Sequence, residues 1–191
     1  MVMEMKEALQ HYLAGQRKVL LTKLDDLPER ELRMPRTPTG TNLLGIVKHC
    51  TNVEYGYFGP TFGRALDDTT GLVTDEQWDA DPQADWYATA DETKDGIVDL
   101  YLRIQAFCDE TIGALPVDAP GEVPWWGDDA AVTLGQVLVH VIQDLARHAG
   151  HADILREGID ESVGFMAPGH NLPEIDFRAY VERLTALAEQ F

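Results

Sequence analysis

The sequence predicts an all-α protein, a bundle of four long helices with long connections and an extra C-terminal helix. Long segments repeat apolar residues at the 3.6-residue period of an amphipathic helix. No segment alternates apolar and polar residues for long enough to require a sheet. With 191 residues, of which 45% are hydrophobic, the chain is long enough to bury a substantial core. We therefore expect a single helical-bundle domain over residues 1–191.

The first two helices are bounded by proline and glycine. Leucines recur at helical spacing over residues 4–27, and Pro28 then interrupts the pattern. After an irregular connection, a second helix is expected over residues 42–58. Thr41 is a suitable N-cap for this helix, and the Gly-Pro pair that follows it would end it.

A polar excursion separates the second helix from the third. Residues 61–85 are rich in Asp, Thr and Gly and show no sustained period, which predicts a long connection with a short helical turn. The third helix is expected over residues 88–114, and a loop that contains Trp125 and Trp126 follows it. The residues of this helix expected to face the core are Ile97, Leu100, Ile104, Phe107 and Cys108.

The fourth helix, over residues 133–158, carries three of the six histidines. Thr133 and Gln136 have the spacing of a capping box, and Gly158 suits the C-terminal end. One face of this helix, roughly 80° wide at about 100° per residue, holds six residues: Val137, His140, Asp144, His148, His151 and Leu155. A face that normally packs on the core therefore carries four groups able to bind a metal ion or a proton. A last amphipathic helix is expected over residues 174–190.

The charge balance excludes several classes of partner. The chain has 15 Lys+Arg against 33 Asp+Glu, a formal charge of −18, which disfavours nucleic acid and an anionic membrane surface. No apolar run approaches the roughly 20 residues of a membrane span, and the first residues lack the layout of a signal peptide. Two cysteines do not make a disulfide framework. We expect a cytoplasmic protein with reduced thiols.

The spacing of Asp144 and His148 indicates a metal site. Residues four apart on a helix lie about 5–6 Å apart at Cβ, so both side chains can reach one ion. A third ligand must come from another helix, and His49 lies on the side of the second helix expected to face the bundle. Two imidazoles and one carboxylate leave coordination positions open, as in catalytic sites. From spacing alone, His49 could equally be a core histidine and Asp144 a partner of Arg147.

Three stretches resemble a known family. VLVHVIQDLARHAGHADILREG, TNLLGIVKHCTNVEYGYFG and VPWWGDDAAVTLGQVL are similar to the DinB-like superfamily, in the branch related to mycothiol-dependent maleylpyruvate isomerase. The resemblance implies a four-helix bundle in which His49, Asp144 and His148 bind a divalent metal ion. Zinc is the favoured ion, and nickel, iron or manganese stay open.

The chain departs from this family at Asp144, where relatives carry His or Glu. Aspartate is one methylene shorter than glutamate, so either the carboxylate approaches the ion more closely or a neighbouring histidine completes the site. His151 and His140 are the candidates for that role, and they are also the candidate catalytic bases. Trp125 and Trp126 are expected to form an apolar wall over the substrate, although a pair of loop tryptophans equally often fills a core.

The resemblance also implies a function. We expect a metal-dependent enzyme that uses a low-molecular-weight thiol, mycothiol or a similar compound, for S-transfer to a small electrophile or for its isomerisation. Its partners would be the thiol and a small-molecule substrate, with a homodimer left open. Two alternatives remain: a metal-dependent hydrolase, and a non-catalytic, stress-related metal-binding or interaction protein. The metal site is common to all three hypotheses.

Overall fold

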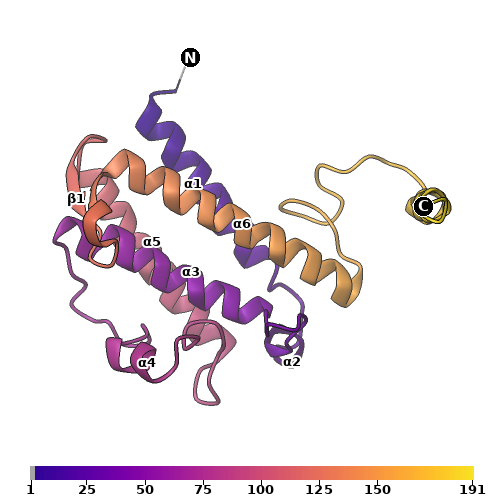
Figure 1. Ribbon diagram of the computed structural model, residues 1–191, viewed down its shortest axis with the longest axis horizontal. Coiled ribbons are helices and arrows are strands. Elements are labelled where there is room, and N and C mark those ends of the chain that lie inside the picture. Colours follow the sequence, from indigo (N-terminus) through magenta and orange to yellow (C-terminus); the bar gives the residue numbers. More distant parts are fainter. Residues whose placement is uncertain (1–2) are drawn as a thin grey trace.

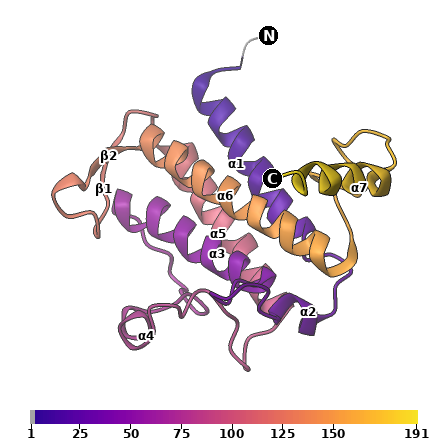
Figure 2. The ribbon, with the colours of Figure 1, turned by 45° about the vertical axis from the view of Figure 1, so that its right-hand side comes forward.

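The computed structural model describes residues 3–191 and is all-α, as the sequence predicts (Figure 1). Within these residues, four long helices form the bundle: α1 (Met5–Thr22), α3 (Leu43–Phe58), α5 (Lys94–Ala114) and α6 (Leu134–Asp160). Helix α3 packs against both α5 and α6, and α6 also packs against α1 (Figures 1 and 2). The interface between α3 and α6 is the one that positions the site.

Shorter elements connect and extend the bundle. They are α2 (Glu29–Arg33), η1 (Pro60–Phe62), α4 (Asp75–Ala80), β1 (Pro120–Glu122), η2 (Gly127–Asp129), β2 (Ala131–Thr133) and α7 (Phe177–Ala188). The strands pair antiparallel, with Gly121 opposite Val132, and close the loop that carries the two tryptophans. The sequence does not predict this pair or α2, because three-residue strands and a five-residue helix are too short to show a period.

The core is built from the apolar stripes of the four long helices. All five residues of α5 that we expected to face inward are buried, which confirms the register of that helix. Cys50 is fully buried as well. Within the described residues, no helix combines the length and hydropathy that crossing a lipid bilayer requires.

Helix boundaries differ from expectation where the connecting chain packs on a helix end. The N-cap of α3 is Asn42 and not Thr41: the Asn42 side chain accepts a hydrogen bond from the amide of Gly45 at 2.8 Å and donates one to the Trp86 carbonyl at 3.1 Å. The connection lies so close that a Cβ at Gly45 would be 1.9 Å from the Trp86 oxygen. The asparagine amide therefore ties the start of α3 to the excursion.

The other three long helices also differ from expectation at one end. Helix α1 ends at Thr22 and not at the predicted residue 27, because residues 23–26 form turns. Helix α5 begins at Lys94, after an N-cap at Thr93, since the preceding residues form turns and not the predicted first helical turns. Helix α6 has the predicted capping box, but it continues past Gly158 to Asp160 and ends at Glu161, whose φ is 61°. A longer α6 carries the chain further from the bundle before the C-terminal segment begins.

The excursion, taken here as the whole connection between α3 and α5 (residues 59–93), packs on both helices, and Arg103 of α5 donates a hydrogen bond to the Thr70 carbonyl at 2.8 Å. Figure 1 shows its short helix, α4, below α3 and separated from it. Lys48 of α3 is buried and donates hydrogen bonds to Glu92 at 2.9 Å and to the Tyr87 carbonyl at 3.1 Å. Asn52 accepts one from the Val73 amide at 2.9 Å. Helix α3 is therefore enclosed on both sides, which explains its buried polar residues.

A buried ion pair joins α1 to α3. Nε of Arg17 donates to Glu54 Oε2 at 2.8 Å, and the Tyr101 hydroxyl donates to the same carboxylate at 2.9 Å. Burial raises the pKa of Glu54 even though Arg17 and Tyr101 oppose that shift. These contacts compensate part of the cost of burying the Glu54 charge and join α1 to α3.

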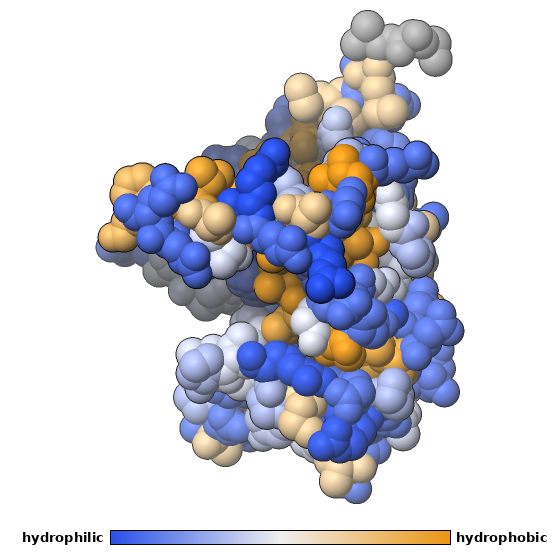
Figure 3. All heavy atoms as spheres, turned by 90° about the vertical axis from the view of Figure 1, so that its right-hand side faces the viewer, coloured by the Kyte–Doolittle hydropathy of each residue, from blue (hydrophilic) through white to orange (hydrophobic). Residues whose placement is uncertain are grey.

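The C-terminal segment extends from the bundle. Helix α7 lies apart from the four long helices in Figures 1 and 2, and none of its residues is buried. It is shorter than predicted because Asp176 caps it by accepting a hydrogen bond from the Ala179 amide at 3.0 Å. Figure 3 shows this side of the molecule, where hydrophilic residues predominate and apolar ones form small patches between them.

Candidate metal centre and its cavity

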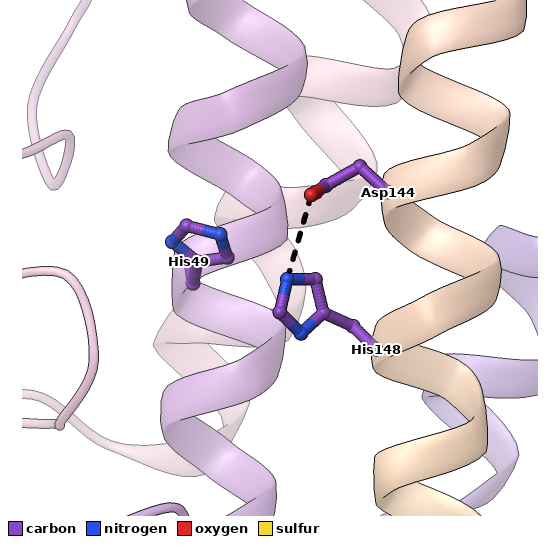
Figure 4. A group of neighbouring side chains, drawn as sticks. All are labelled: His49, Asp144 and His148. Carbon is purple, nitrogen blue, oxygen red and sulfur yellow. Dashed lines mark ion pairs between the residues drawn. The ribbon is translucent and has the colours of Figure 1, made fainter.

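Three residues from two helices converge between α3 and α6. His49 comes from α3, and Asp144 and His148 come from consecutive turns of α6 (Figure 4). Each offers one ligand atom, and these atoms all lie within 4.8 Å of one another. Since metal–ligand bonds to nitrogen and oxygen are about 2.0–2.2 Å long, a single ion can bridge such a group.

The unsatisfied atoms of the cluster support a cation. Nε2 of His148 lies 3.6 Å from Oδ1 of Asp144, too far for a hydrogen bond. Oδ2 of Asp144 and Nδ1 of His148 are buried and have no hydrogen-bond partner within the described residues. Buried polar atoms without partners are costly and rare, and an ion bound by the cluster would give the Asp144 carboxylate a partner. Two imidazoles and a carboxylate are also a donor set that suits zinc and related divalent ions.

His49 is held in one orientation by the excursion. Its Nδ1 lies 2.7 Å from Oδ2 of Asp85, a buried carboxylate. The Trp86 ring stacks on the imidazole with centroids 3.9 Å apart and an angle of 19° between the planes. The bond from Nδ1 to a carboxylate leaves Nε2 as the nitrogen available to an ion, an arrangement typical of metal-binding histidines.

The Asp144 carboxyl is ionised at neutral pH. Burial acts to raise its pKa, but the close approach of His148, together with the charges of His49 and His140, outweighs burial. The pKa of Asp144 therefore lies below its ordinary range. A carboxylate that is already ionised needs no proton loss to bind a cation.

A cavity of about 860 Å³ opens on the cluster, with His49 and Asp144 among the residues that line it. Aromatic residues from three segments line it as well: Tyr57 of α3, Trp78 of α4 and Trp125 of the tryptophan loop. The Trp125 ring lies edge-on to Tyr57, with centroids 5.1 Å apart. A cavity of this volume accommodates a small molecule, and its apolar lining is typical of ligand sites.

The other residues singled out from the sequence occupy different positions. His140 lines the cavity between Tyr57 and Trp126, at centroid distances of 4.7 and 5.1 Å. Trp125 lines the cavity and is 54% exposed, whereas Trp126 is partly buried against the core. His151 is exposed and lies outside the cavity lining, with its ring centroid 5.5 Å from that of His148. Partial desolvation, followed by the charges of His148 and Arg147, lowers the pKa of His151.

The two cysteines do not contribute a nucleophile. Cys50 and Cys108 are free and buried, and burial raises the pKa of both thiols. A buried thiol with a raised pKa carries little thiolate at neutral pH and is unreactive. Neither cysteine is therefore a candidate nucleophile for this site.

Sequence reasoning missed Asp85, Trp86 and Trp78, which all come from the excursion. Asp85 lies 36 residues from His49, and no spacing rule connects a loop carboxylate to a helical histidine so far away. The available signal was the presence of Trp78 and Trp86 in an otherwise polar stretch, because large aromatic residues rarely remain exposed there. Such residues indicate that the excursion packs on the bundle.

Comparisons with known proteins place the chain in a family. No curated protein matches it. A solved structure, described as the conserved protein of locus from Enterococcus faecalis, has a TM-score of 0.55 and 16% identity, covering 82% of this chain and 97% of that one. This likeness shows the fold alone. The mycothiol-S-transferase family matches residues 8–161, which include most of α1, the cluster and the cavity. The chain therefore belongs to the mycothiol-S-transferase family, within the DinB-like superfamily whose motifs its sequence resembles.

Proposed function

We propose that this protein is a metal-dependent S-transferase that joins a low-molecular-weight thiol, mycothiol or a close analogue, to a small electrophile. The observation that carries the proposal is the cluster of His49, Asp144 and His148, whose ligand atoms lie within 4.8 Å of one another beside a cavity of about 860 Å³. The name of the family supports the thiol as the co-substrate.

His49, Asp144 and His148 would hold a divalent ion. When bound, the ion supplies a positive centre that lowers the pKa of a coordinated thiol. A ring nitrogen of His140, which lines the same cavity, accepts the thiol proton. The sulfur then forms a bond to the electrophilic carbon, and either the proton returns to the adduct or a leaving group departs with the bonding electrons. Trp125 and Tyr57 hold the apolar part of the substrate against the reacting sulfur.

The two alternatives make different demands on the site. A non-catalytic binding protein would need ligands that close the coordination sphere, and His140 and His151 are the residues available for this. Within residues 3–191, the group of potential ligands contains neither of them. A hydrolase using metal-bound water would share the open cluster, and the family name favours the thiol over water. The open cavity therefore supports an enzyme.

The test combines metal analysis with a thiol-consumption assay. Purified protein is loaded with zinc, nickel, iron or manganese, and loss of free mycothiol is followed in the presence of a panel of electrophiles. We expect turnover that requires the ion and is lost in His148→Ala. Turnover that survives both a chelator and His148→Ala would contradict the proposal, as would release of hydrolysis products without thiol loss.

Two further variants locate the base. His140→Ala should slow turnover while metal content stays unchanged, because His140 lines the cavity and stands outside the ligand group. The sequence analysis also named His151, which is exposed and outside the lining. His151→Ala is therefore the matched variant. A loss of turnover in His151→Ala alone would transfer the role to His151.

A further inference from the structure

We infer that the cavity selects its second substrate by charge, taking an uncharged or cationic aromatic electrophile and disfavouring carboxylates, sulfonates and phosphates. The inference rests on the proposed function only in assigning this cavity to the electrophile. It adds the chemical class of that molecule, which neither the metal cluster nor the family determines. The evidence for the inference is the set of charged and aromatic residues that line the cavity.

All the charged residues of the cavity wall, apart from its histidines, are acidic. Asp75, Glu76, Asp85 and Asp144 line it, and neither lysine nor arginine is among the lining residues. A divalent ion would be balanced by Asp144, its ligand, and by Asp85, the partner of His49. The remaining two carboxylates, at the start of α4, would keep the cavity negative even with the ion bound.

Among the described residues, the carboxylates of Asp75 and Glu76 have no counter-ion. No ion pair within residues 3–191 involves either of them. Hydrogen bonds from its own backbone amide and from Thr74 lower the pKa of Glu76, so this carboxyl is ionised at neutral pH. The whole chain adds to their field with its formal charge of −18. An anionic molecule that enters the cavity therefore meets repulsion with no cation from the protein to offset it.

The aromatic residues of the lining favour a second property of the ligand, a flat apolar ring. Trp78 belongs to the same short helix as the two carboxylates, and Trp125 lines the cavity from the tryptophan loop. Indole faces bind apolar rings and also attract cations. A flat aromatic molecule without negative charge satisfies both the aromatic and the acidic parts of the lining.

The experiment measures binding, which does not depend on turnover. Equilibrium dialysis of the metal-loaded full-length protein is carried out with three ligands that share a ring: 2-naphthylmethanol, (2-naphthylmethyl)trimethylammonium and naphthalene-2-sulfonate. The sulfonate is a poor metal ligand, so bonding to the ion does not obscure its charge. We expect the neutral and cationic ligands to bind more tightly than the sulfonate. Trp125→Ala should weaken the binding of all ligands that do bind, which locates them in the cavity.

A charge variant then tests whether Asp75 and Glu76 cause this order of binding. The double variant Asp75→Asn/Glu76→Gln should tighten sulfonate binding and weaken ammonium binding, while naphthylmethanol changes little. Two unit charges at an assumed distance of about 8 Å in water change the binding of each charged ligand by roughly two- to six-fold, the lower value with ionic screening. Asp79→Asn, on the same helix but outside the cavity lining, is the matched control and should cause a smaller change.

Several results would overturn the inference. The first is that the sulfonate binds as tightly as naphthylmethanol. The second is that the affinities of all three ligands change equally in the double variant. The third is that none of the three ligands binds. Failure of the proposed function would look different. The order of binding would hold, but no electrophile of any charge would consume thiol. Conversely, thiol transfer to anionic electrophiles as fast as to neutral ones would leave the enzyme in place and remove the charge selection.

Discussion

Asp85 offers a sharp test of how the excursion controls the metal centre. Its buried carboxylate lies 2.7 Å from Nδ1 of His49, and it comes from a part of the chain that contributes none of the proposed ligands. Asp85→Asn keeps an oxygen that accepts the Nδ1 hydrogen bond but removes the negative charge. Asp85→Ala removes both, so the imidazole loses its orientation as well.

The expected magnitude follows from this contact. Loss of the outer partner of a metal-binding histidine typically lowers metal affinity 10- to 100-fold, or by about 1.4–2.7 kcal/mol. Asp85 is only 5% exposed, so solvent does little to screen its charge. We therefore expect Asn to fall near the lower end of this range and Ala near the upper end.

The assay is competition for zinc against a chromophoric chelator at one pH, with thermal unfolding of the metal-free proteins as a check on the fold. Asp75→Asn is the matched control, because Asp75 lines the same cavity and makes no contact with His49 in the hydrogen-bond network described. Wild-type affinity in both Asp85 variants would refute the reasoning. An equal loss in Asp75→Asn would assign the effect to the general field of the cavity and not to the bond with His49.

Three further predictions concern the ligands and the bundle. Asp144→Asn should weaken metal binding in the same competition assay, and Asp144→Glu should preserve or tighten it; equal affinities of all three proteins would remove Asp144 from the ligands. Metal occupancy should fall on dialysis as the pH drops through about 6, because an imidazole binds a metal ion only when deprotonated and the reference pKa of imidazole in model peptides is about 6.5. The pKa of Asp144 is lowered by folding, so its stabilising contribution is present above the ordinary carboxyl range and is lost only at lower pH, which separates the two titrations. Arg17→Met should lower the free energy of unfolding, measured in urea, by about 3–5 kcal/mol, because Glu54 stays buried without its partner. Arg178→Met, in an exposed pair, should change this free energy by less than about 1 kcal/mol. Similar changes in the two variants would contradict this prediction.

The long helices and their inward faces were predictable because each has a strong local signal. The stripe of α5 and the capping box of α6 depend only on residues close in sequence. The ends of α3 and α5 were less predictable, because contacts with the excursion decide them. The Asn42 cap, for example, is bonded to the carbonyl of Trp86, which lies 44 residues away.

Some residues of the candidate site were likewise predictable from the sequence and others were not. The pair Asp144 and His148 follows from helical spacing, and the stripe on the second helix suggested His49. Their convergence depends on how α3 crosses α6, and local sequence carries no information about this crossing. The resemblance to the DinB-like superfamily predicted that the three residues converge. Asp85 and Trp86 could not be predicted, because their place beside His49 depends on the path of an irregular segment.

The central claim is that His49, Asp144 and His148 hold an ion with a position open to a thiol. The most direct measurement is the absorption spectrum of the cobalt-substituted protein, recorded before and after addition of mycothiol, with His148→Ala in parallel. We predict one cobalt ion per chain, a new sulfur-to-cobalt charge-transfer band when the thiol is added, and neither cobalt nor band in His148→Ala. Cobalt that binds equally well without His148, or a spectrum unchanged by the thiol, would contradict the claim.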